Sequence, residues 1–89
     1  MKPFHFEFSP AAERAFAKFQ KPLQRRLLNK LDYFEAAENP LIHAKQLKGL
    51  DHIYRFRVGE YRVLVKPNEK NLWVILVIVK IAHRREANE

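Results

Sequence analysis

The sequence predicts an α+β fold in which one strand and a helical hairpin precede a mostly antiparallel sheet. Three observations support this prediction. Apolar and polar residues alternate near the N-terminus, then follow a helical period, and alternate again after residue 53. With 89 residues, the chain can bury one small core. We therefore expect a single domain over residues 1–89, ordered β-α-α-β-β-β, with both helices on one face of the sheet.

The first strand is expected at residues 3–8, where phenylalanines alternate with polar residues. Ser9 and Pro10 then mark a helix start. The serine oxygen can accept a bond from a free backbone N–H, and proline at the first helical position sacrifices no hydrogen bond. This helix is expected to run to about Gln20.

A second apolar stripe begins at Leu23, directly after Lys21 and Pro22, and predicts another helix. The stripe continues to Phe34, and Asn39-Pro40 stops it. Because the connection between the helices is short, we expect them to form an antiparallel hairpin.

The second half of the chain contains a β-hairpin signature. Residues 54–58 and 61–66 each alternate in polarity, and Gly59-Glu60 between them fits a two-residue type II′ turn. That turn places Val58 opposite Tyr61, Arg57 opposite Arg62, and Phe56 opposite Val63. Residues 67–71 are predicted to form the next turn, and the apolar residues 72–82 a central strand.

Composition narrows the class of function. The chain has 17 Lys and Arg against 10 Asp and Glu, a net charge of +7, which favours polyanionic partners. It has no cysteine, which excludes disulfides, a thiolate zinc site and a cysteine nucleophile and is typical of a cytoplasmic protein. His5 and His43 have no companion ligands at metal spacing, so they are expected to be structural or surface residues. No metal or other cofactor is expected. The longest apolar run is too short to cross a membrane. The helices carry charges of both signs and lack the Lys/Arg-rich face of a membrane-surface helix, so no membrane partner is expected.

The predicted register places Arg55, Arg57 and Arg62 on one face of the sheet. Like charges directly opposite each other destabilise a sheet by up to ~1 kcal/mol, so stability alone does not favour this arrangement. The acids nearest in sequence, Asp51 and Glu60, do not fall on that face by parity. The cluster therefore indicates an anion site, with a merely solvated arginine face as the alternative.

Beyond these patterns, the chain resembles a known family. The stretch Lys45-Gln46-Leu47-Lys48-Gly49-Leu50, the hairpin from Tyr54 to Leu64, and the ending His83-Arg84-Arg85-Glu86 are similar to the RelE/ParE toxins of bacterial type II toxin–antitoxin modules, the RelE-like branch in particular. The resemblance implies a RelE-like fold and a toxin that its cognate antitoxin protein neutralises.

The resemblance also implies an activity. RelE toxins cleave messenger RNA on the ribosome, where the substrate 2′-OH attacks the adjacent phosphate without a metal, whereas ParE toxins poison DNA gyrase. The positions that match the family's catalytic and phosphate-binding residues are Arg55, Arg57, Arg62 and Arg84. The nucleic-acid-binding residues are predicted to be Lys45, Lys48, Arg55, Arg57, Arg62 and Arg85.

Three positions depart from the best-known members in two ways. Arg55 and Arg57 stand where those members carry lysine, and arginine stays protonated and cannot act as a base. Asn88 stands where the family's C-terminal tyrosine is expected. We therefore expect His83 to be the catalytic group that titrates, the alternative being a structural histidine at a strand end.

Three functions follow in this order. The first is a metal-independent endoribonuclease, an mRNA interferase whose partners are the ribosome and mRNA. The second is a ParE-like inhibitor of DNA gyrase. The third is an attenuated homologue that only binds its antitoxin.

Overall fold

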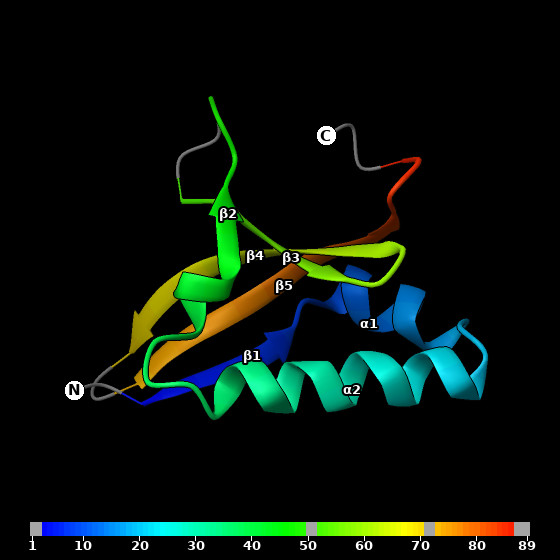
Figure 1. Ribbon diagram of the computed structural model, residues 1–89, viewed down its shortest axis with the longest axis horizontal. Coiled ribbons are helices and arrows are strands. Elements are labelled where there is room, and N and C mark those ends of the chain that lie inside the picture. Colours follow the sequence, from blue (N-terminus) through cyan, green and yellow to red (C-terminus); the bar gives the residue numbers. More distant parts are fainter. Residues whose placement is uncertain (1–2, 50–51, 71–72, 87–89) are drawn as a thin grey trace.

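The computed structural model describes residues 3–49, 52–70 and 73–86, with only the backbone described at Lys70 and Trp73. Within these residues, the strands form a five-stranded sheet ordered β1-β5-β4-β3-β2 (Figure 1). β1 pairs with β5 in parallel, and the other neighbours are antiparallel. The strands are β1 Phe4–Phe8, β2 Ala44–Gln46, β3 Tyr54–Val58, β4 Tyr61–Lys70 and β5 Trp73–His83.

Two helices, α1 Pro10–Ala17 and α2 Lys21–Glu35, lie on one side of this sheet (Figure 1). The core forms where helices and sheet meet. Phe56 is fully buried at its centre, with its ring centroid 4.7 Å from that of Phe34 on α2 and 5.4 Å from that of Phe6 on β1. The predicted α+β fold is therefore confirmed.

The helix starts follow the predicted chemistry. Oγ of Ser9 accepts a hydrogen bond from the backbone N–H of Ala12 at 3.1 Å, and Pro10 is the first helical residue. α1 ends at Ala17, earlier than expected, because Gln20 is already extended as the residue that precedes α2. A helix cannot run through an extended residue, so the corner between the helices begins sooner.

The β3–β4 hairpin has the predicted register, with Val58 opposite Tyr61, Arg57 opposite Arg62 and Phe56 opposite Val63. Gly59 has a positive φ of +58°, and Glu60 does not have a positive φ. A two-residue type II′ turn requires a positive φ at its first central residue only.

The prediction of a turn at residues 67–71 was wrong. β4 continues to Lys70, and Pro67 pairs with Leu76 of β5. Proline is tolerated here because β3 pairs with β4 only as far as Val65, so the far arm of β4 has a free edge where a missing N–H breaks no ladder bond. Residues 71 and 72, which complete the predicted turn and begin the predicted last strand, lie outside the described residues.

Two elements were not predicted from the sequence. A short 3₁₀ helix, η1 Pro40–His43, leads into β2, whose three residues pair with β3. A strand of that length is too short to show an alternating pattern. An irregularity between Leu64 and Val65 also shifts the β4–β5 register, so that Val63 faces Ile81 and Val65 faces Ile78. The shift keeps all four of these residues buried.

No helix in the described part of the chain is long and apolar enough to cross a membrane.

Candidate nucleic-acid interface

The sheet face that points away from the helices is basic. The register aligns Lys45, Arg55, Leu64 and Lys80 in one row across the strands, and Arg57, Arg62 and Ala82 in the next. Residues directly opposite each other share a face, so all five cations of these rows lie on the same side. Lys45, Arg57 and Lys80 are exposed, and Arg55 is half-buried. We call Lys45, Arg55, Arg57, Arg62 and Lys80 the basic face.

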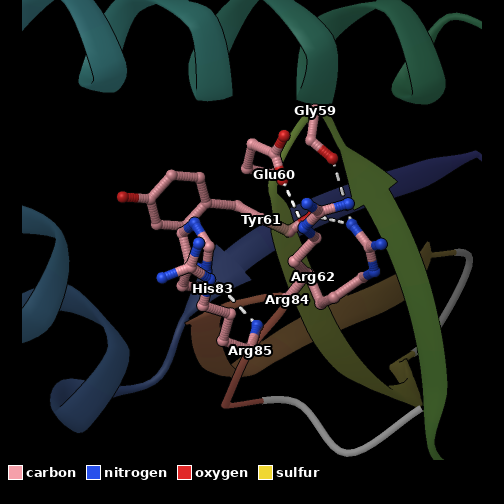
Figure 2. A network of polar contacts seen from close by, with 7 residues as sticks. All are labelled: Gly59, Glu60, Tyr61, Arg62, His83, Arg84 and Arg85. Atoms are coloured by element: carbon pink, nitrogen blue, oxygen red, sulfur yellow. Dashed lines mark hydrogen bonds and ion pairs between the residues drawn. The ribbon is translucent and has the colours of Figure 1, made fainter.

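Arg62 differs from the rest of the basic face because it is buried, with 3% of its surface exposed. Its Nη1 donates to the backbone oxygen of Gly59 at 3.0 Å and to that of Tyr61 at 3.1 Å (Figure 2). Burying a cation is costly unless its N–H groups find acceptors, and these carbonyls supply two. The guanidinium that the sequence assigned to phosphate binding thus holds the hairpin turn.

Arg84 is also tied to this turn. Its backbone N–H donates to the oxygen of Glu60 at 2.7 Å, and its Nε lies 2.6 Å from Oε2 of Glu60 (Figure 2). Strand parity had predicted that Glu60 lies away from the arginines. Parity does not govern a turn residue, and the carboxylate of Glu60 reaches a cation of the predicted site.

His83 lies on the opposite face from the arginines. His83 on β5 pairs with Tyr61 on β4, and Arg62, which follows Tyr61, pairs with Ala82. Successive residues of a strand point to opposite faces, so His83 and Arg62 lie on different sides of the sheet (Figure 2). The rings of His83 and Tyr61 meet edge to face, with centroids 5.3 Å apart. Nδ1 of His83 accepts the backbone N–H of Arg85 at 3.2 Å. The structure therefore does not bring the expected titrating group together with the basic face.

The remaining predicted residues lie outside this face. Lys48 is exposed in the segment after β2, and Arg85 is exposed in the turn after β5. Asn88 and Asp51 lie outside the described residues. The part of the chain that the structure describes holds no group of three or more His, Cys, Asp or Glu side chains able to bind a metal.

Sequence reasoning missed two residues near the arginines. Lys80 joins the basic face through the shifted β4–β5 register, and Glu60 reaches Arg84 from the hairpin turn. Lys80 interrupts an apolar strand, which could have drawn attention to it. Its face could not be assigned, because the register shift was not visible in the sequence.

Solved structures of RelE toxins have a similar fold. The RelBE2 toxin–antitoxin complex from Mycobacterium tuberculosis matches with a TM-score of 0.71 at 22% identity, covering 92% of this chain and 99% of that one. An archaeal RelE–RelB complex from Pyrococcus horikoshii matches with a TM-score of 0.68 at 24% identity, covering 96% and 99%. A free double arginine-to-alanine mutant of Escherichia coli RelE matches with a TM-score of 0.70 at 20% identity, covering 98% and 88%. These similarities define a RelE-like fold.

The family itself follows from the sequence. Residues 6–88 match the family of ParE toxins of type II toxin–antitoxin systems, and the chain belongs to this family. No curated protein matches the chain. The resemblance to the RelE/ParE superfamily is thereby confirmed.

Proposed function

We propose that this toxin is a metal-independent mRNA interferase that acts on the ribosome. The observation that supports the proposal is the basic face. Three exposed cations, Lys45, Arg57 and Lys80, project from strands of one sheet. The phosphates of an RNA strand are the natural partners for such a row, and their binding releases counterions.

The chemistry needs charge stabilisation above all. The substrate 2′-oxygen bonds to the adjacent phosphorus, the bond from phosphorus to the 5′-oxygen breaks, and a cyclic phosphate and a free 5′-hydroxyl result. In the transition state the phosphorus is bonded to five oxygens, which carry extra negative charge. Arg57 and Arg55 would stabilise this charge. None of the five residues of the basic face is a histidine or a carboxylate, so water takes the 2′-OH proton and water donates a proton to the departing 5′-oxygen. We therefore expect slow cleavage.

An antitoxin protein is the proposed partner. The M. tuberculosis and P. horikoshii relatives are solved as complexes of a toxin with its antitoxin. With a net charge of +7 here, an acidic antitoxin segment would be attracted to the basic face. In covering this face, the antitoxin would exclude RNA.

Inhibition of DNA gyrase is the second candidate, and two observations favour it. The matching family is that of ParE toxins. The position of His83 across the sheet from Arg62 also removes the expected acid–base group from the basic face. A toxin of this kind binds its target and cuts no RNA.

One experiment separates these functions. The protein is induced in bacteria without antitoxin, and messenger RNA 5′ ends are mapped within minutes. Arg57→Ala is the test variant because Arg57 is exposed and its loss should leave the fold intact. Arg14→Ala, an exposed arginine of α1 on the helical side, is the matched control.

We expect cuts at in-frame positions of translated messages with the native protein and Arg14→Ala, and at least tenfold fewer with Arg57→Ala. Growth arrest with DNA damage and intact messages would instead establish the gyrase function. Growth without arrest would identify an attenuated homologue.

A further inference from the structure

A pocket of about 500 Å³ opens between the α1–α2 corner and the β3–β4 hairpin. These two segments lie at the same end of the molecule (Figure 1). Lys18 and Phe19 from the corner, Leu23 and Arg26 from α2, and Tyr61 from β4 contribute to its walls. A volume of this size falls within the ~300–1,000 Å³ range of small-molecule sites.

The pocket has an aromatic floor. The rings of Phe19 and Tyr61 are half-buried, with centroids 5.7 Å apart. Phe19 also contacts the ring of Phe16, and Tyr61 contacts the ring of His83 edge to face. Aromatic rings held in this way, with part of their surface open, form stacking platforms for nucleic-acid bases.

The rim of the pocket is cationic. Lys18 and Arg26 are exposed, and no carboxylate is present among the described residues that line the pocket. Nη1 of Arg26 lies beside the hairpin turn, 3.2 Å from where a Cβ of Gly59 would be. The guanidinium therefore stands at the mouth between helix and hairpin, where it can meet an anion. Arginine suits phosphate oxygens because its planar fork can bind two of them.

We propose that this pocket binds one nucleotide of single-stranded RNA, with the base against Phe19 and Tyr61 and its phosphate at Arg26 and Lys18. RNA as the ligand class rests on the proposed function. Tyr61 lies on the helix side of β4 and its neighbour Arg62 on the basic face. An RNA strand that passes the hairpin end can therefore place phosphates on the basic face and one base in the pocket.

The test measures binding by the purified toxin of a fluorescein-labelled oligouridylate of about nine nucleotides. A ribose-phosphate oligomer of equal length without bases reports the phosphate contribution alone. Arg26→Ala removes the cation at the mouth, and Phe19→Leu removes half of the floor. Arg25→Ala is the matched control, because Arg25 is an exposed neighbour on α2 that does not line the pocket. Circular dichroism and thermal melting confirm that each variant folds.

We expect Arg26→Ala and Phe19→Leu each to raise the Kd for oligouridylate at least fivefold, and Arg25→Ala by less than about twofold. Phe19→Leu should not weaken binding of the oligomer that lacks bases. Equal losses for Arg25→Ala and Arg26→Ala, or equal affinity of the native protein for both oligomers, would overturn the proposal. So would a loss of antitoxin binding by Arg26→Ala with RNA binding unchanged, because the occupant would then be a protein.

Two further comparisons complete the design. Binding to ribosomes without message distinguishes the sources: weaker binding by Phe19→Leu would mean that ribosomal RNA fills the pocket, and unchanged binding would mean that messenger RNA does. Intact messages in cells, with preference for base-bearing RNA retained in vitro, would refute the mRNA interferase and leave the pocket standing. Cleaved messages in cells, with no preference for base-bearing RNA in vitro, would support the mRNA interferase and refute the nucleotide pocket.

Discussion

Arg57 and Arg62 face each other directly across the β3–β4 hairpin, yet one is exposed and the other is 3% exposed. The difference follows from the contacts of Arg62, whose Nη1 turns back to the carbonyl oxygens of Gly59 and Tyr61. The two paired arginines therefore have different roles. Arg62 stabilises the turn, and Arg57 is left on the basic face.

We predict unequal losses of stability when each side chain is truncated. Arg62→Ala removes two hydrogen bonds and a buried side chain and should lower the free energy of unfolding by about 1–3 kcal/mol. Arg57→Ala should change it by less than about 0.5 kcal/mol, since surface substitutions rarely do more. Urea denaturation of both variants tests this, and equal effects would contradict the structural role of Arg62.

The ion pair between Glu60 and Arg84 should contribute little to stability. Both side chains are about half exposed, at 54% and 51%, so water and salt screen the pair. Glu60→Gln should therefore cost less than about 1 kcal/mol of unfolding free energy. The difference from the native protein should vanish in about 1 M NaCl, where the screening length is only about 3 Å. A loss that persists at high salt would show that the pair contributes more than screened charge.

The hairpin turn should reject a side chain at Gly59. Its φ of +58° is left-handed, and alanine there should cost about 1–2 kcal/mol. Gly49 is the matched control, because its φ is +76° and open space surrounds the position that a Cβ would take. The flexible tip of Arg26 can move away from a Cβ at position 59, so the two alanine variants should agree within about 0.5 kcal/mol of unfolding free energy. A much larger loss at Gly59, measured by thermal melting, would mean that Arg26 is rigidly held.

Glu35 should anchor the outer edge of β1. Its Oε2 accepts the backbone N–H of Phe6 at 3.0 Å, and its Oε1 lies 3.3 Å from Nδ1 of His5. Glu35→Ala should lower the free energy of unfolding by about 1–2 kcal/mol and speed amide exchange at Phe6. Glu35→Gln keeps an acceptor oxygen, so it should restore most of the protection at Phe6. Unchanged exchange in Glu35→Ala would rule out the anchoring role.

Much of the fold was predictable because its signals are local. Alternating phenylalanines indicated β1, and Ser9-Pro10 indicated the start of α1. Gly59-Glu60 indicated the turn that sets the register of Arg57 against Arg62. The prediction of a turn at residues 67–71 was wrong because proline usually ends a strand. Pro67 is tolerated inside β4 only because that part of β4 has a free edge.

The candidate site was predictable only in part. Arg55, Arg57 and Arg62 share a face as expected, because hairpin register follows from the turn. Lys80 joins them through the register shift within the β4–β5 pair, and the pairing of His83 with Tyr61 puts His83 on the opposite face of the sheet. Neither pairing leaves a mark in the sequence, because both lie beyond the irregularity at Leu64 and Val65, which no local pattern indicates.

The sequence alone therefore determined the helices, the hairpin with its facing arginines, and the excess of positive charge. Short-range patterns encode these features, and each needs only neighbouring residues to form. The tertiary structure decided that Arg62 is buried, that Glu60 binds Arg84, and that an aromatic pocket opens beneath Arg26. These features depend on how the helices pack against the sheet and on how its strands pair. Such contacts join residues that no local sequence pattern connects.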